Sequence, residues 1–271
     1  MAEKKPLNFQ WAINHGIAEE MRRDPSVFIV GEDVGKPGGP FGVTRGIIDE
    51  FGSERAVDTP ISEGAIIGLC CGAAAAGLRP VAEIMFMNFI TLCVEEFYNQ
   101  ASKMRWMFGG QVKQPFVVRA MTAGGFGAGP HHSSSLEGWF ASMPGMKVVM
   151  PSNPVTAKGL MKAAIRDDNT VLYVEPLASY KLKMMMPEGD YITPIGKAEV
   201  VKEGSDVTIV SIGRMLAEAE KAASALEKDG IKAEVIDLLT VNPFDMETIY
   251  ESVKKTNRCA IIHEAKKIMG C

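Results

Sequence analysis

The sequence predicts an α/β fold built on parallel sheets, and three observations lead to that prediction. Short, continuously apolar runs alternate with segments of helical periodicity, which is typical of parallel strands covered on both faces. The 271 residues are 46% hydrophobic and 23% charged, an ordinary globular composition with length for a sizeable core. The alternation stops near residue 180 and then resumes. We therefore expect two domains, 1–179 and 200–271, joined by a linker at 180–199.

The elements of the first domain follow in order. Residues 6–23 predict a helix because Ile13, Ile17 and Met21 recur at helical spacing. Ser62 is a good N-cap for a helix that Gly77 would close. Strands are expected at 27–33, 80–86, 116–120, 146–150 and 170–176, further helices at 88–107 and 153–167, and glycine-rich loops at 36–42 and 122–135.

The second domain begins after a linker of irregular pattern that includes Met184, Met185 and Met186. We interpret these methionines as a packed or partly exposed connector. Strands are expected at 206–213, 232–238 and 258–265, and helices at 215–226 and 246–255. The last strand is followed by only a few residues, so we expect this α/β domain to be truncated.

Composition narrows the possible functions. The net charge is −4 and the basic residues are dispersed, so no nucleic-acid partner is expected. No apolar run is long enough to cross a membrane, and the N-terminus has no signal-peptide core. The five cysteines have no metal-binding spacing and indicate reduced thiols. We expect a cytoplasmic protein of a bacterium or archaeon, ahead of the mitochondrial matrix.

Glu63 is an unusual residue for its position. It opens the run "EGAIIGLCCGAAAAGL", which contains no other charge. A carboxylate in apolar surroundings is costly unless it is paired, hydrogen-bonded or used in chemistry. The sequence alone leaves these three explanations open.

Two adjacent histidines, His131 and His132, end the second glycine-rich loop. The run "GGFGAG" before them does not fit a dinucleotide fingerprint, because Pro130 stands where the last glycine would be. Sites of α/β proteins gather at the carboxyl ends of strands, where this loop begins. We expect one of the two histidines to donate a hydrogen bond to an oxyanion or to move a proton.

The remaining candidates have weaker signals. Glu32 and Asp33 end a strand, and the interpretation as ordinary exposed loop acids is slightly favoured. His15 is expected on a helix surface. His263, with Glu264 beside it, ends a strand of the second domain, and structural and functional interpretations are equally supported there.

Several long segments resemble one family closely. They are "GEDVGKPGGPFGVTRGIIDEFG", "AVDTPISEGAIIGLCCGAAAAGLRPVAEIMFMNF", "NQASKMRWMFGGQ", "HHSSSLEGWFASMPGMKVVMPSNPVTAKGLMKAAIRDDN" and "VIDLLTVNPFD". They resemble the β subunit of the thiamine-diphosphate-dependent decarboxylase component of 2-oxo-acid dehydrogenase complexes, the family of pyruvate, branched-chain and acetoin dehydrogenases. "MFMNF" and "MFGGQ" look most like the acetoin branch. The implied fold is a pyrimidine-binding α/β domain followed by a transketolase C-terminal-type domain.

The resemblance implies roles for particular residues. Glu63 matches the glutamate that hydrogen-bonds N1′ of the thiamine aminopyrimidine, and Met85 and Phe89 match residues lining that pocket. His132 matches the active-site histidine of the β subunit. His131, Glu32 and Asp33 are secondary candidates near the substrate or in a proton relay. The segment Ala164, Ile165, Asp167 and Asn169 matches a potassium site in some relatives.

The resemblance also implies partners. No Gly-Asp-Gly followed by an asparagine at metal-binding spacing occurs, and in the family the α subunit supplies that motif. We therefore expect an α2β2 heterotetramer in which Mg²⁺ binds through the α subunit. The acyl unit produced would pass to a lipoyl group of a partner acyltransferase. The enzyme would then be an oxidoreductase acting on 2-oxo acids or acetoin, active only with its α subunit.

Two alternatives stay open. The chain resembles, less closely, half of a transketolase or deoxyxylulose-phosphate synthase. It could also be a truncated, non-catalytic assembly partner. The family usually reads Gln-His-Ser-Gln-Ser where this chain has His131 to Ser135, and often has a second histidine where Ser142 stands. These departures, together with the expected truncation, motivate the second alternative.

Overall fold

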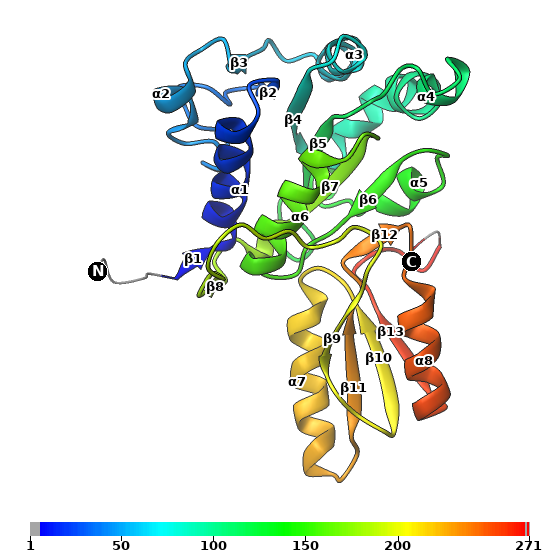
Figure 1. Cartoon of the computed structure of the whole chain (residues 1–271). Coiled ribbons are helices and arrows are strands. Elements are labelled where there is room, and N and C mark those ends of the chain that lie inside the picture. Colours follow the sequence, from blue (N-terminus) through cyan, green and yellow to red (C-terminus); the bar gives the residue numbers. More distant parts are fainter. Residues whose placement is uncertain (1–5, 269, 271) are drawn as a thin grey trace.

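The structure, a computed structural model, describes residues 6–268 and residue 270. It contains a large sheet in the upper half of Figure 1 and a smaller one below it, and both halves carry helices on their faces. The seven strands of the large sheet lie in the order β12-β6-β7-β5-β4-β2-β3. Six of them run parallel: β2 (Val27–Gly31), β3 (Ala56–Asp58), β4 (Arg79–Phe86), β5 (Val117–Thr122), β6 (Lys147–Val149) and β7 (Val171–Pro176). The predicted α/β class is confirmed.

Helices cover both faces of this sheet. On one face α1 (Phe9–Arg23) packs along α6 (Pro154–Arg166). The other face carries α3 (Glu63–Ala75) and the segment that follows β4. The short helices α2 (Ile47–Phe51) and α5 (Glu137–Ala141) complete this half. Because both faces are covered, the central strands β5 and β7 are buried along their whole length, which explains their continuous apolar pattern.

The single helix predicted over 88–107 is wrong. The segment instead forms a 3₁₀ turn at Phe89–Cys93, a π-helical turn at Glu96–Ala101 and the short helix α4 (Met104–Met107). Ser102 explains part of the break, because its hydroxyl donates to the Tyr98 carbonyl at 2.8 Å while its amide donates to Phe97 at 3.0 Å. When a serine hydroxyl donates to the carbonyl four residues earlier, the serine amide is free to donate to the carbonyl five residues earlier. That pattern is the hydrogen bonding of a π-helical turn.

The second sheet has the order β13-β10-β11-β9. Its strands β10 (Val207–Ser211), β11 (Ala233–Asp237) and β13 (Cys259–Ile262) are parallel, as predicted, and α7 (Met215–Lys228) and α8 (Met246–Thr256) flank them. Strand β9 (Glu199–Lys202) joins antiparallel and was not predicted. Strand β12 (Thr240–Asn242), also unpredicted, crosses back and pairs antiparallel with β6 of the large sheet.

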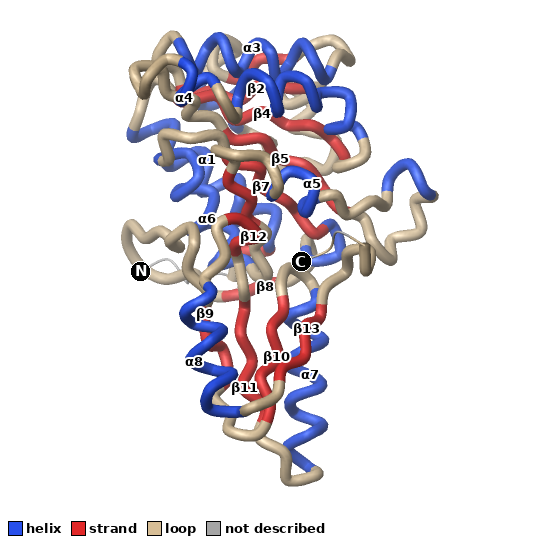
Figure 2. Tube along the Cα trace, turned by 90° about the vertical axis from the view of Figure 1, so that its right-hand side faces the viewer, coloured by secondary structure: helices blue, strands red, loops and turns tan. Residues whose placement is uncertain are grey.

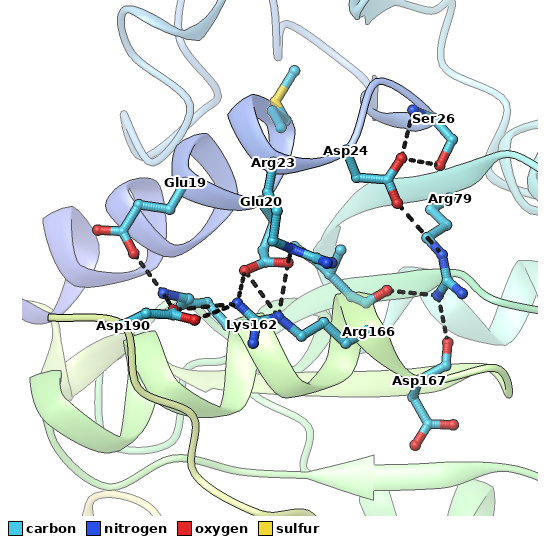
Figure 3. Close-up of polar contacts among 12 residues, drawn as sticks. Glu19, Glu20, Arg23, Asp24, Ser26, Arg79, Lys162, Arg166, Asp167 and Asp190 are labelled. Carbon is cyan, nitrogen blue, oxygen red and sulfur yellow. Dashed lines mark hydrogen bonds and ion pairs between the residues drawn. The ribbon is translucent and has the colours of Figure 1, made fainter.

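The linker is held against the first domain. Its strand β8 (Lys183–Met184) pairs antiparallel with β1 (Leu7–Asn8). Farther along, the Asp190 carboxylate binds the Lys162 ammonium, and it accepts hydrogen bonds at 3.1 and 3.2 Å from Arg166 (Figure 3). Both basic residues lie on α6, so the linker crosses that helix on its way to the second domain.

The methionines of the linker behave as the predicted connector. Met184 and Met185 are exposed, while Met186 packs against the core beneath α1 and α6. The cysteines Cys70, Cys71 and Cys93 are buried free thiols, as expected. Burial raises the pKa of Cys71 to about 12, so this thiol is inert rather than catalytic.

Candidate active site

Two loop acids and a helix N-terminus meet at the carboxyl end of β2. The strand ends at Gly31, whose carbonyl accepts a hydrogen bond from the Thr59 amide at 3.0 Å. This bond holds the segment that leads into α3 beside the end of β2. Glu63 is the first residue of α3 and is half-buried. Ser62 is the N-cap as predicted, but its side chain makes no capping hydrogen bond.

Glu32 lies close enough to Glu63 for their charges to interact. Burial raises the pKa of Glu32, and the charges of Glu63, Asp33 and Glu83 raise it further. Glu32 is half-buried, whereas Asp33 is exposed and adopts a left-handed backbone with φ of 54°. The acids at this strand end therefore divide into two half-buried residues, Glu32 and Glu63, and one exposed residue, Asp33.

A charge network that the sequence analysis missed lies beneath these acids. The guanidinium of Arg119 on β5 donates to Glu83 on β4 at 2.5 Å, and to both oxygens of Glu175 on β7 at 2.7 and 3.1 Å. The Tyr180 hydroxyl also donates to Glu175. All four side chains are buried. Burial raises the pKa of Glu83, with Arg119 opposing this effect. The signal was present as single charged letters inside three apolar strands.

His132 packs edge-on against two aromatic rings. Its ring centroid lies 4.8 Å from that of Phe86 and 5.5 Å from that of Phe89, with interplanar angles of 82° and 84°. His132 is half-buried and His131 is exposed. Met85 and Phe89 are partly buried at the edge of the core. Phe86 was not anticipated as a neighbour of His132.

Asn88 ties the histidine loop to the end of β4. Its amide donates to the Ser134 hydroxyl at 2.7 Å and to the Pro130 carbonyl at 3.2 Å, and its carbonyl oxygen accepts from the Ser134 amide at 3.1 Å. The segment after β4 therefore supplies both the aromatic wall and the polar anchor of His132. The sequence signal was the "MFMNF" run, in which only Met85 and Phe89 were singled out.

The second domain also reaches this loop. Nε2 of His263 lies 2.9 Å from Oε1 of Glu137, the first residue of α5. Arg214 donates to Glu264 at 2.7 Å. The Glu264 carboxylate lies against Gly124, where a Cβ would be 1.9 Å from Oε1 of Glu264.

The backbone predicted as a potassium site is engaged by a cation of the chain itself. The guanidinium of Arg79 donates to the carbonyls of Ile165 at 2.9 Å and Asp167 at 3.0 Å (Figure 3). The Ala164 carbonyl accepts from the Asp167 amide at 3.2 Å, and the Asn169 side-chain oxygen accepts from Arg105 at 2.7 Å. A carbonyl oxygen has two lone pairs, so these groups retain some capacity for a further ligand.

Within residues 6–268 and 270, no group of three or more acidic, histidine or cysteine side chains could hold a metal ion. The same part of the chain has no helix long and apolar enough to cross a membrane. A cavity of about 780 Å³ lies apart from the acids and His132, and its lining includes Trp106, Gln114 and Gly145.

The chain matches two family descriptions over most of its length. Residues 5–181 match the transketolase pyrimidine-binding domain, and residues 196–271 match the transketolase C-terminal domain. It is 46% identical to the β subunit of acetoin:2,6-dichlorophenolindophenol oxidoreductase of Cupriavidus necator, over 98% of this chain and 80% of that protein. It is 47% identical to the 2-oxoisovalerate dehydrogenase β subunit of Bacillus subtilis, over 94% of this chain and 79% of that protein.

Two further relatives extend this picture. The chain is 43% identical to the β subunit of the pyruvate dehydrogenase E1 component of Bacillus subtilis, over 96% of this chain and 80% of that protein. Among solved structures, an inactive β4 tetramer of a split-gene transketolase superposes with a TM-score of 0.80 at 24% identity, covering 97% of this chain and 81% of that one. At that identity the likeness shows the fold alone.

Proposed function

Since the chain belongs to the family of 2-oxo-acid and acetoin dehydrogenase β subunits, with the transketolase pyrimidine-binding and C-terminal domains, we propose that it forms one half of a thiamine-diphosphate active site. The other half would come from an α subunit in an α2β2 heterotetramer. The observation that carries the proposal is the position of Glu63 as the first residue of α3, which the hydrogen bond from Thr59 to Gly31 holds beside the carboxyl end of β2. Bound thiamine diphosphate would supply the electron sink for cleaving a bond beside a carbonyl group.

The residues present fit the aminopyrimidine end of that cofactor. Glu63 opens α3, where the helix dipole and free amide groups stabilise a carboxylate. The raised pKa of Glu32 means that this neighbour holds its proton to higher pH than an ordinary glutamate. A carboxyl pair of this kind can exchange a proton with a ring nitrogen. Met85 and Phe89 are partly buried, and Phe89 packs against His132; the two side chains would form the apolar wall of the pocket.

His132 would serve the substrate side. Its contacts with Phe86 and Phe89 hold the ring in place, while its half-exposed position leaves it accessible. A histidine there can donate a hydrogen bond to a developing oxyanion or carry a proton near neutral pH. His131 and Asp33, both exposed, would be secondary contributors at the mouth of the site. The acyl unit would leave for a lipoyl group on a partner acyltransferase.

Metal binding would fall largely to the α subunit. The described part of this chain offers no cluster of three metal-ligating side chains, so Mg²⁺ and the diphosphate would be held by the partner. A potassium ion at the carbonyls of Ala164, Ile165, Asp167 and Asn169 remains a prediction. It would share oxygens with Arg79. Replacing Na⁺ by K⁺ should then raise the thermal stability of the complex.

The test is turnover in the reconstituted complex. The chain would be assembled with its cognate α subunit, thiamine diphosphate and Mg²⁺, and reduction of 2,6-dichlorophenolindophenol would be followed with pyruvate, 2-oxoisovalerate or acetoin. The relatives named above are 43–47% identical and do not separate these substrates. Glu63→Gln should lower turnover by about 100-fold or more. Glu50→Gln, which alters an exposed acid on α2, is the matched control. Turnover with none of the three substrates, or unchanged turnover in Glu63→Gln, would contradict the proposal.

A further inference from the structure

The loop that carries His132 is bounded by two contacts to the second domain. It leaves β5 at Gly124 and ends at α5, whose first residue is Glu137. His132 lies between these two points. We propose that the second domain clamps this loop at both ends and so fixes the position of His132, with Glu137 and His263 as positioning residues. This inference rests on the proposed function only for the role of His132.

The first end of the clamp is at the glycines. The Glu264 carboxylate lies so close to Gly124 that a Cβ at this position would be 1.9 Å from Oε1. Arg214 holds Glu264 at 2.7 Å, and its guanidinium also lies near Gly125. Glu264 follows β13 and Arg214 follows β10, so the carboxyl ends of two neighbouring parallel strands converge on the start of the loop.

The second end of the clamp is at α5. The Glu137 side chain is fully buried and accepts hydrogen bonds from the Ser135 hydroxyl at 2.8 and 3.0 Å. Nε2 of His263 lies 2.9 Å from the same carboxylate, and the His263 side chain is only 7% exposed. A carboxylate buried to this degree is costly without polar partners, and the second domain supplies one of them through His263.

Together these contacts act on one short segment. Between the two ends, the Asn88 contacts and the packing of His132 on Phe86 and Phe89 hold the loop to the first domain. The loop contains four glycines, at positions 124, 125, 127 and 129. Without the clamp, these glycines would permit wide backbone freedom. The clamp therefore supplies the preorganisation that a proton-handling histidine needs. It also gives a role to His263 and Glu264, whose interpretation the sequence left open.

The test measures the order of the loop independently of enzyme turnover. Hydrogen exchange of residues 124–135 would be measured by mass spectrometry in the full chain, alone and with its α subunit. His263→Leu should speed exchange in this segment roughly tenfold, because it removes the contact to Glu137. His263→Gln retains a side-chain N–H donor and should restore slow exchange. Arg214→Gln, at a partly exposed position, should loosen residues 124–127 without disturbing folding.

Activity gives a second readout. His263→Leu should lower kcat on the order of 10- to 100-fold while the Kd for thiamine diphosphate stays within about twofold, because Glu63 is untouched. Ile261→Ala is the matched control, because it shortens an exposed side chain on β13 without touching Glu137. It shows whether any substitution near the end of this strand lowers kcat. Unchanged exchange in 124–135, or failure of His263→Gln to restore it, would overturn the clamp. Absence of turnover in the wild type with the exchange pattern intact would count against the proposed function alone.

Discussion

At the scale of single residues, Arg119 is the centre of a buried charge network. One guanidinium serves two carboxylates, Glu83 and Glu175, in a region without solvent access. Parallel pairing makes the arrangement possible, because Glu83 on β4 is directly opposite Arg119 on β5. The network lies below the acids at the end of β2, and its Glu83 charge acts on Glu32.

Removing Arg119 should be strongly destabilising. Arg119→Met would leave two buried carboxyl groups without their cation, which typically costs about 3–5 kcal/mol in the free energy of unfolding. Urea denaturation of the purified chain measures this loss. Lys113→Met breaks an exposed pair with Asp168 and should change stability by less than about 1 kcal/mol. A loss no greater for Arg119→Met than for this control would show that the network contributes nothing.

At the scale of secondary-structure elements, two helix starts differ in a way that can be measured. The Asn153 side chain accepts the Thr156 amide at 3.0 Å and forms a capping box at the start of α6. Ser62 occupies the same position before α3 without a capping hydrogen bond. The sequence alone predicted a cap at Ser62 because serine is favoured there, but the backbone of Ser62, with ψ of 79°, departs from the usual cap geometry.

The two caps should therefore respond differently to alanine. Asn153→Ala should lower the free energy of unfolding by about 1 kcal/mol, since an amide of the first turn loses its acceptor. Ser62→Ala should change the free energy of unfolding by only about 0.3 kcal/mol, because no capping hydrogen bond is lost. Thermal or urea denaturation of both variants decides the matter. Equal losses would mean that Ser62 caps α3 in solution.

A buried acid at the end of β11 predicts a pH dependence. Oδ1 of Asp237 accepts the hydroxyl of Ser152 from the first domain at 2.7 Å. Burial raises the pKa of Asp237 from 3.8 to about 8, and the charges of Glu199 on β9 and Glu220 on α7 add to this. The folded state therefore keeps a proton that the unfolded state releases. Stability from this group is complete below the unfolded pKa and is lost as the pH rises toward 8.

The Asp237→Asn variant isolates this effect. Its amide stays neutral at every pH, so the free energy of unfolding of the wild type should fall relative to the variant between pH 4 and 8, on the order of a few kcal/mol. Urea titrations of both proteins at several pH values measure the difference. Two curves that remain parallel across this range would mean that Asp237 titrates normally and that the contact between domains is insensitive to pH.

At the scale of the whole molecule, the two domains share one continuous packing unit. Val210, Ile212, Ile236 and Leu238 of the second domain belong to the same buried cluster as Ile66 and Phe97 of the first. Strand β12 adds to this by joining the large sheet. Contacts from the second domain can therefore act directly on the loop that bears His132.

Sequence patterns predicted most of this architecture, because apolar strands and amphipathic helices are local signals. The order of the longer elements in both domains and the loops at 36–42 and 122–135 followed from them, whereas the short elements β1, α2, β3 and β8 were not predicted. Strands β9 and β12 were missed because each is short and is stabilised by distant partners, β11 and β6. The break in the segment after β4 depends on Ser102, which a periodicity search does not detect.

In the candidate site, too, single residues could be predicted from the sequence, whereas the contacts between them could not. Glu63 and the adjacent histidines stood out from the residue pattern, and the family resemblance then selected His132 and added Met85 and Phe89. The structure places Phe89 beside His132. The contacts that hold these residues come from positions far apart in sequence. Asn88 bonds Ser134 across the sheet end, and His263 reaches Glu137 from another domain. Such pairings depend on tertiary packing and leave no periodic trace.

We propose that this chain holds only the aminopyrimidine half of a shared site, with Glu63 as its essential acid. Calorimetric titration of thiamine diphosphate with Mg²⁺ tests it most directly, using the chain alone, the chain with its cognate α subunit, and the same mixture carrying Glu63→Gln. We expect tight binding only in the wild-type mixture, with clear weakening in the variant. Tight binding by the chain alone, or equal binding in the Glu63→Gln mixture, would contradict the claim.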